Sequence, residues 1–270
     1  MTGINPPTLD ILGRDLLRVQ HWRLIISLIT PFALAGSYFA LAFSGYWMLA
    51  VGCVVALSFM TYGSISHDLV HRSLGLPRWF NELLLTTIEL LVFRSGRAYR
   101  LTHLNHHARY PDIHNDPESL AAYGTFWAAL WSGPLFFIRL WWWANRRFPH
   151  HRARLLAEAV LICGTGLAAL TIALCGWSVI PLAYMVLAYL GTWIVPVVTS
   201  YVPHTPHGKN PLLQTRRFRG WLARLVAFDH LYHLEHHLYP AVPHHRWVEL
   251  AWRLNPYLDR AGVPSVRLGF

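Results

Sequence analysis

Residues 46–71 read YWMLAVGCVVALSFMTYGSISHDLVH, an apolar run that continues without a break into a pair of histidines. The run Tyr46–Ser66 holds no charged residue, and its length matches the roughly 20 residues that a helix needs to cross a bilayer. His67 and His71 follow at a spacing of i, i+4, which places both imidazoles on one face of a continuing helix. The stretch therefore predicts a membrane span that presents two histidines at its end.

Three further apolar runs have a comparable length. They are Leu24–Phe43, Leu155–Trp177 and Val179–Ser200. Hydrophobic residues make up 54% of the chain and charged residues 13%, against about 25% charged residues in a typical soluble domain. We therefore predict four transmembrane helices. The first is expected to be retained, because residues 1–22 are too long and too polar for the start of a signal peptide.

The net charge of +10 is explained by the membrane rather than by nucleic acid. The basic residues flank the apolar runs, as the positive-inside bias predicts, and a basic cytoplasmic face attracts acidic redox partners. Cys53, Cys163 and Cys175 all lie in apolar runs without a CxxC motif, so we expect neither a disulfide nor a metal role for them.

Two shorter apolar segments are expected not to cross the membrane. Phe80–Phe93 is too short, and Phe126–Trp143 is interrupted by Gly133–Pro134 and carries Arg139. A metal site must gather its ligands on one side of the bilayer. A full crossing at Phe126–Trp143 would separate His204 from His67, so both segments are predicted to be re-entrant or interfacial helices.

Two more histidine clusters follow the first. HLNHH occupies residues 103–107 and HLEHH occupies residues 233–237. In each, the histidines stand at i, i+3 and i+4 and share one helical face. Eight histidines exceed the four ligands of one tetrahedral zinc, so they favour two metals, with His204 as a ninth candidate. The predicted ligands are His67, His71, His103, His106, His107, His204, His233, His236 and His237.

A metal-bound imidazole usually donates its second N–H to a nearby acceptor. Asp68, Asp229 and Glu235 stand beside the clusters and are the expected acceptors, and Asp112, Asp116 and Glu118 are further candidates. For His114, His207 and His230, a metal role and a structural role stay open. His21, His150, His151, His244 and His245 are interpreted as structural.

Two other classes of protein are compatible with many histidines. A non-catalytic haem protein needs two histidines that face each other across a bundle, rather than triplets at i, i+3, i+4. A zinc hydrolase of the membrane would act without O2. Metal analysis separates both from a redox enzyme.

The clusters, in this order and at the ends of these spans, resemble the membrane fatty acid desaturase superfamily. HDLVH resembles its first histidine box, HLNHH its second and HLEHH its third, and His233–Pro243 (HLEHHLYPAVP) is similar to bacterial members. The resemblance covers roughly residues 46–250. His204 is similar in position to an additional ligand of the family, with His207 as a competitor.

The resemblance implies two iron ions held by these histidines, O2 as co-substrate and an apolar lipid substrate from the bilayer. It also implies an external electron donor such as ferredoxin or a cytochrome. Acyl or lipid desaturation is the favoured activity. Ketolation or hydroxylation of a carotenoid ring is the alternative, because the HxxxH box and the DPE after the second box also occur in bacterial carotenoid ketolases.

The expected fold is an all-α integral membrane protein with a single domain over residues 1–270. It comprises four transmembrane helices, re-entrant or interfacial helices and a cytosolic, histidine-rich di-iron cap. We expect it in a bacterial inner membrane, with the active site and both termini in the cytoplasm.

Overall fold

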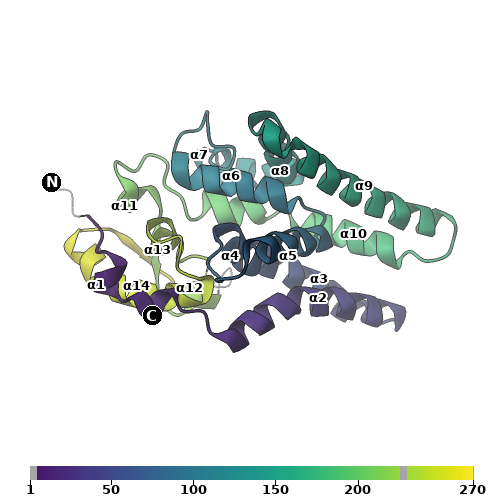
Figure 1. Ribbon diagram of the computed structural model, residues 1–270, viewed down its shortest axis with the longest axis horizontal. Helices are drawn as coiled ribbons and strands as arrows, with labels where there is room; N and C mark the ends of the chain where they lie inside the picture. The colour runs from purple at the N-terminus through teal and green to yellow at the C-terminus, as the bar shows by residue number, and fades with distance from the viewer. Residues whose placement is uncertain (1–4, 226–229, 270) are drawn as a thin grey trace.

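Long apolar helices form one end of the protein, and short elements form a cap at the other (Figure 1). The computed structural model describes residues 5–225 and 230–269. Four helices extend to the first end: α2 (His21–Phe43), α3 (Trp47–Met60), α9 (Arg152–Leu174) and α10 (Ile180–Gly191). Their buried core includes Tyr38, Leu57 and Tyr184. The turns that follow α2 and α9 lie at the same end of the bundle (Figure 1).

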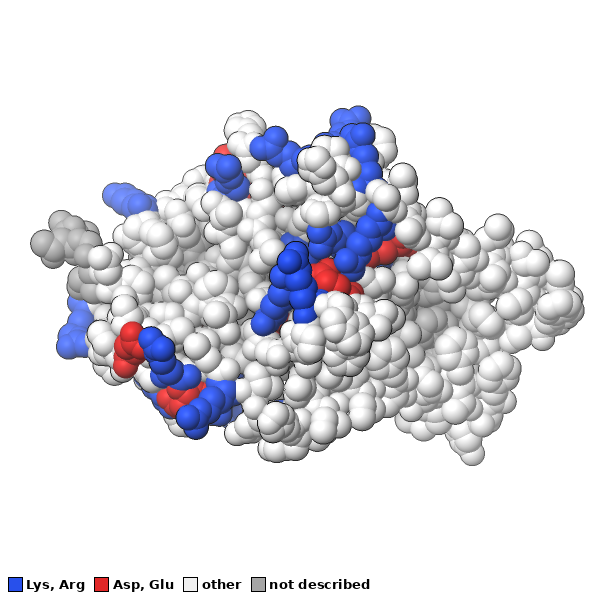
Figure 2. Space-filling view, in the orientation of Figure 1, with Lys and Arg blue, Asp and Glu red and all other residues white. Residues whose placement is uncertain are grey.

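Three helical segments among the described residues are long and apolar enough to cross a membrane. They are Arg14–Phe43, Trp47–His71 and Pro149–Leu174. The visible surface at this end carries no Lys, Arg, Asp or Glu, and these residues gather over the rest of the molecule (Figure 2). The absence of charge is what a surface in contact with lipid requires, since a charged side chain in hydrocarbon is costly.

The fourth predicted span differs from the expectation. The run Val179–Ser200 is not one helix, because α10 ends at Gly191, a turn follows, and a π-helix, η4 (Val197–Tyr201), begins after Pro196. Proline has no N–H to continue the helical ladder. α10 packs closely against α3 at its last residue, Gly191. A Cβ at Gly191 would lie 2.3 Å from the Ser58 Oγ.

A second layer joins this bundle to the cap. α3 passes through a π-helix, η2 (Thr61–Ile65), into α4 (Ser66–His71), which packs against α5 (Arg78–Leu91) and α6 (Gly96–Arg109). α8 (Phe126–Arg147) packs against α6. α5 and α8 are the two segments predicted to be re-entrant or interfacial, and neither is among the three candidate spans.

The cap combines the first residues of the chain with its last 60 or so. Its elements are α1 (Leu9–Leu12), η1 (Arg14–Leu17), α11 (Pro211–Gln214), β1 (Arg217–Arg219), α12 (Leu222–Leu225), α13 (His233–Leu238), η5 (His244–Arg246), α14 (Trp247–Arg260) and β2 (Ser265–Arg267). Two further short elements come from the middle of the chain: α7 (Leu120–Tyr123) packs against η4 and α8, and η3 (Pro149–His151) packs against α8 and α9. The strands pair in parallel, with Phe218 opposite Val266. A core around Trp247 and Leu254 holds α13 against α14 and so places the third histidine cluster.

Candidate metal centre

Two groups of imidazoles meet where α4, α6 and α13 converge. The first group is His67, His71, His103, His107 and His236, and the second is His106, His204, His233 and His237. Within each group, one nitrogen from every histidine lies within 4.8 Å of those of the others. The structure thus brings together all nine histidines that the sequence singled out.

The helical spacing divides each triplet between the two groups. His103 and His107, at i and i+4, face the first group, while His106 faces the second. The third cluster does the reverse, because His236 faces the first group and His233 and His237 face the second. Two helices therefore hold both groups side by side, an arrangement that suits a pair of neighbouring metal ions.

The nitrogen atoms approach one another at metal-chelating distances. The Nε2 atoms of His103 and His67 are 3.0 Å apart, as are those of His106 and His204. The Nε2 atoms of His107 and His236 are 2.8 Å apart. Nitrogens that converge in this way can chelate a cation, and neutral imidazole is a ligand for iron, copper and zinc. The donor set therefore fits metal ions.

Burial keeps most of these imidazoles neutral. It lowers the pKa of His103, His107, His204 and His236 well below its ordinary value, and the neighbouring imidazoles lower it further. His106 behaves differently. Burial lowers its pKa, but the Asp116 carboxylate more than offsets this effect, so that the pKa is raised. Neutral imidazoles have the free lone pairs that metal binding requires.

Three cluster histidines have an acceptor for the other ring nitrogen. His106 Nδ1 donates to Asp116 Oδ2 at 2.7 Å, and His103 Nδ1 donates to Glu118 Oε2 at 2.9 Å. His204 Nδ1 donates to the Ser200 carbonyl at 2.9 Å. Such acceptors fix the orientation of a ligating imidazole and raise its basicity. The Ser200 carbonyl was missed by sequence reasoning, because a backbone acceptor leaves no side-chain signal.

The other expected acceptors have different positions. Asp68 accepts hydrogen bonds from the Ser73 hydroxyl and the His244 backbone amide rather than from an imidazole, so the expected role is corrected. Glu235 is fully buried, and neither carboxylate oxygen has a hydrogen-bond partner in the described part of the chain. Burial raises the pKa of Glu235 to about 7. Asp229 lies outside the described residues.

The three histidines left open by the sequence are also placed. His114 and His207 are exposed, and the ring of His207 packs against Tyr123 with centroids 5.6 Å apart. His204, the competing position, lies in the second group. His230 is buried beside His233, with ring centroids 4.9 Å apart, but belongs to neither group.

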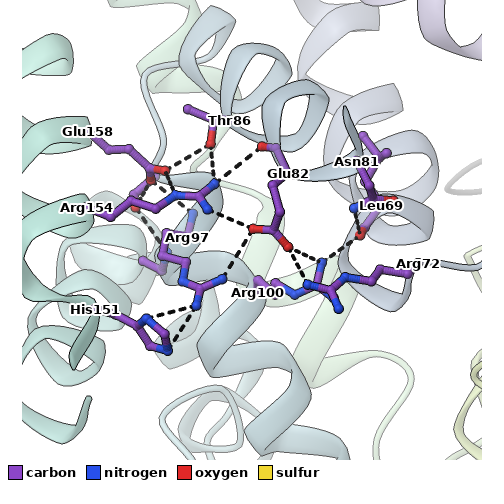
Figure 3. A network of polar contacts seen from close by, with 12 residues as sticks. Leu69, Arg72, Asn81, Glu82, Thr86, Arg97, Arg100, His151, Arg154 and Glu158 are labelled. Carbon is purple, nitrogen blue, oxygen red and sulfur yellow. Dashed lines mark hydrogen bonds and ion pairs between the residues drawn. The ribbon is translucent and has the colours of Figure 1, made fainter. Parts of the chain in front are cut away.

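A network of ion pairs joins α4, α5, α6 and α9 (Figure 3). The Glu82 carboxylate of α5 pairs with Arg72, Arg97, Arg100 and Arg154 at 2.7 to 3.2 Å. Burial raises the pKa of Glu82, but the arginines more than offset it, and the pKa is lowered. These arginines come from the end of α4, from α6 and from α9, so one carboxylate ties four segments together.

A second carboxylate completes the network. Glu158 of α9 accepts from the Ser95 hydroxyl at 2.6 Å and from the Arg97 backbone amide at 3.0 Å, at the start of α6. Arg100 also donates to the Leu69 carbonyl at 3.0 Å. α4 and α6, which carry five of the nine histidines, are thereby held in register.

A family model described as fatty acid desaturase matches residues 44–268. The chain belongs to the fatty acid desaturase family. This confirms the resemblance seen in the three histidine boxes. The dihydrorhizobitoxine desaturase of Bradyrhizobium elkanii is 25% identical over 213 residues, an alignment that covers 67% of this chain and 60% of the relative. The chain thus spans less than two thirds of that relative's length. All nine histidines of this desaturase-family chain lie within the matched residues.

Proposed function

We propose that the protein is an O2-dependent di-iron oxidoreductase of the membrane that removes hydrogen from unactivated C–H bonds of an apolar lipid. Fatty-acyl or lipid desaturation is the favoured reaction. The observation that carries the proposal is the pair of adjacent imidazole groups, of five and four histidines. Family membership supports a desaturase-type oxidoreductase and the membrane setting.

Iron is the proposed metal, one ion in each group. Five imidazoles exceed the four ligands of a tetrahedral zinc site, and the acceptors at His103, His106 and His204 would orient these imidazoles toward a bound metal. Bound iron would supply the activation of O2. Asp116 and Glu118 would hold two of the ligating imidazoles in orientation, and the surrounding helices would exclude water.

The reaction balances with an external reductant. One O2, two electrons and two protons oxidise a CH–CH unit to an alkene and give two water molecules. The electrons would come from a donor such as ferredoxin. The chain's excess of Lys and Arg, 23 against 13 acidic residues, suits an acidic donor.

The proposed topology has four membrane crossings, with the broken fourth run completing the last one. The cap, the imidazole groups and both termini would then be cytoplasmic in a bacterial inner membrane. Support comes from the charge-free end of the bundle, where both interhelical turns lie (Figures 1 and 2). Cysteines introduced at Gly45 and Gly176 should react only with reagents on the periplasmic side.

Product analysis tests the function. The wild-type protein, His236→Ala and the control His150→Ala, which changes an exposed histidine outside both groups, are expressed in a host supplied with fatty acids and β-carotene. We expect new unsaturated lipids from the wild type and the control and none from His236→Ala. A ketone or hydroxyl on the carotenoid ring would establish the alternative activity. Full activity of His236→Ala would refute the metal assignment.

A further inference from the structure

A small cavity lies close to the imidazole groups, between the two π-helices η2 and η4. It has a volume of about 20 Å³, and its lining includes Ser58 from α3, Tyr62 and Gly63 from η2, Thr199 from η4, and His230. A space of this size admits one water-sized group and no more. π-helical turns inside helices are frequent at functional sites.

Three polar side chains in the cavity wall have no hydrogen-bond partner in the described residues. They are the Ser58 hydroxyl, the Tyr62 hydroxyl and both ring nitrogens of His230, and the three residues are at most 2% exposed. The Gly63 backbone lies beside His230 and the Thr199 side chain beside Tyr62, and Thr199 donates its hydroxyl to the Val195 carbonyl. Buried polar groups almost always have partners, so a small polar group held in the cavity would complete these three.

Only the side chain of His230 separates the cavity from the proposed metal ligands His233 and His67. The ring centroid of His230 is 4.9 Å from that of His233 and 6.0 Å from that of His67. On the other side, Tyr62 stacks on Tyr99 at 4.3 Å, and Tyr99 contacts His103 at 5.6 Å. An atom bound in the cavity would therefore lie close to the imidazole groups.

An apolar groove adjoins the cavity and shares Ser58, Phe59, Gly191 and Ile194 with it. The groove has a volume of about 350 Å³ and lies between α3 and α10. That volume falls within the usual range of ligand pockets, roughly 300–1,000 Å³. Val55 and Leu190 are about half exposed there, so the groove opens on the surface that we assign to the bilayer.

We propose that the groove receives the apolar part of the substrate and the cavity receives one of its oxygen atoms. The substrate class is then a lipid that carries an alcohol, ether or carbonyl oxygen close to the oxidised C–H bond. A plain hydrocarbon segment would leave Ser58, Tyr62 and His230 unpaired. This inference rests on the proposed function, and it narrows the substrate within it.

Competition photolabelling of the full-length protein in lipid nanodiscs tests the proposal. The probe is an octadecan-1-ol with a diazirine next to the alcohol, and the competitors are octadecan-1-ol and octadecane. We expect labels on groove and cavity residues such as Ile194 and Val198. The alcohol should compete at least about tenfold better than the alkane, because a site built for a hydroxyl rejects the analogue that lacks it.

Matched variants identify the groups responsible. Tyr62→Phe and Ser58→Ala should bring the two competitors within about twofold of each other, since each removes an oxygen with little change in shape. Ser132→Ala, which removes a hydroxyl from α8, should leave the tenfold preference intact. Iron content is measured on the same preparations, and both cavity variants should keep it.

Several results would overturn the proposal. One such result is equal competition by the alcohol and the alkane in a protein that binds two irons and oxidises a lipid. The proposed function would then hold, but the cavity would be a site for bound water and not for a substrate oxygen. Labels away from the groove would do the same. A preference for the alcohol in a protein without iron would overturn the substrate role together with the proposed function.

Discussion

His106 Nδ1 and Asp116 Oδ2 lie 2.7 Å apart, and both residues are only 1% exposed. Replacing Asp116 by Asn should keep the side chain's shape and remove the charge that raises the basicity of His106. Loss of such a partner typically weakens metal binding by about 10- to 100-fold. Competition with a calibrated chelator measures this. Asp112→Asn, in an exposed turn with Asn115, is the control, and equal weakening in both variants would contradict the role of Asp116.

The pH dependence of the metal-free protein follows from the third histidine cluster. Burial lowers the pKa of His233, His236 and His237 well below 6.5. Below about pH 6.5 such an imidazole takes up a proton in the unfolded chain but not in the folded one. Its contribution to the free energy of unfolding is therefore complete above that pH and is lost on acidification. The slope approaches about 1.4 kcal/mol per pH unit for each such imidazole.

Glu118 and Glu235 change the stability of the fold in the opposite direction as the pH falls. Burial raises the pKa of Glu118 and Glu235 to about 7, so their contribution is lost as the pH rises from about 4.5 to 7. The histidines with a lowered pKa outnumber these two acids. Thermal unfolding of chelator-treated protein in detergent should therefore give a lower midpoint at pH 5 than at pH 7.5, and a midpoint that rises on acidification would exclude this account.

A fully buried ion pair braces η2 beside the site. Arg94 Nε lies 2.9 Å from Glu89 Oε2, and Arg94 donates to the Thr61 hydroxyl at 2.7 Å. Glu89→Ala should cost about 3–5 kcal/mol, because it leaves the buried guanidinium unpaired. The double variant Glu89→Leu, Arg94→Met should be markedly more stable than Glu89→Ala. Denaturation in mixed micelles checks both, and a single variant as stable as the double would show that the pair is not the cause.

The contact between α8 and the turn after α10 depends on one glycine. A Cβ on Gly133 would lie 2.1 Å from the Trp193 carbonyl oxygen, whereas one on Gly36 would meet nothing within 4 Å. Gly133→Ala should therefore destabilise the protein by about 1–3 kcal/mol, while Gly36→Ala should not destabilise it, because alanine is the better helix former. The unfolding midpoints compare the two, and similar values for both would contradict the close packing.

The sequence predicted much of the site because helical spacing is a local property. The i, i+3 and i+4 positions put each histidine cluster on one helical face, as the two imidazole groups confirm. The parity of four membrane crossings, which predicted a single cytoplasmic side for the clusters, stays a prediction. The division of His103 and His106 between two groups was not predicted, because it depends on how α6 lies against α4 and α13. Glu118 was named only as a further candidate, since the path of the loop after α6 decides which carboxylate reaches His103.

The end of α10 within the fourth apolar run and the position of His230 could not be predicted from the sequence. Hydropathy counts apolar residues and carries no information on the close approach of Gly191 to Ser58, at which α10 ends. His230 has no regular spacing partner of its own, so only the packed structure shows that its ring lies beside His233 and Gly63.

The metal content of the purified full-length protein tests the central claim most directly. Two non-haem irons per chain are expected, with loss of iron in His106→Ala and His236→Ala, which remove one ligand from each group, and full retention in His150→Ala. Zinc alone, a haem Soret band, or unchanged iron in both ligand variants would contradict the account.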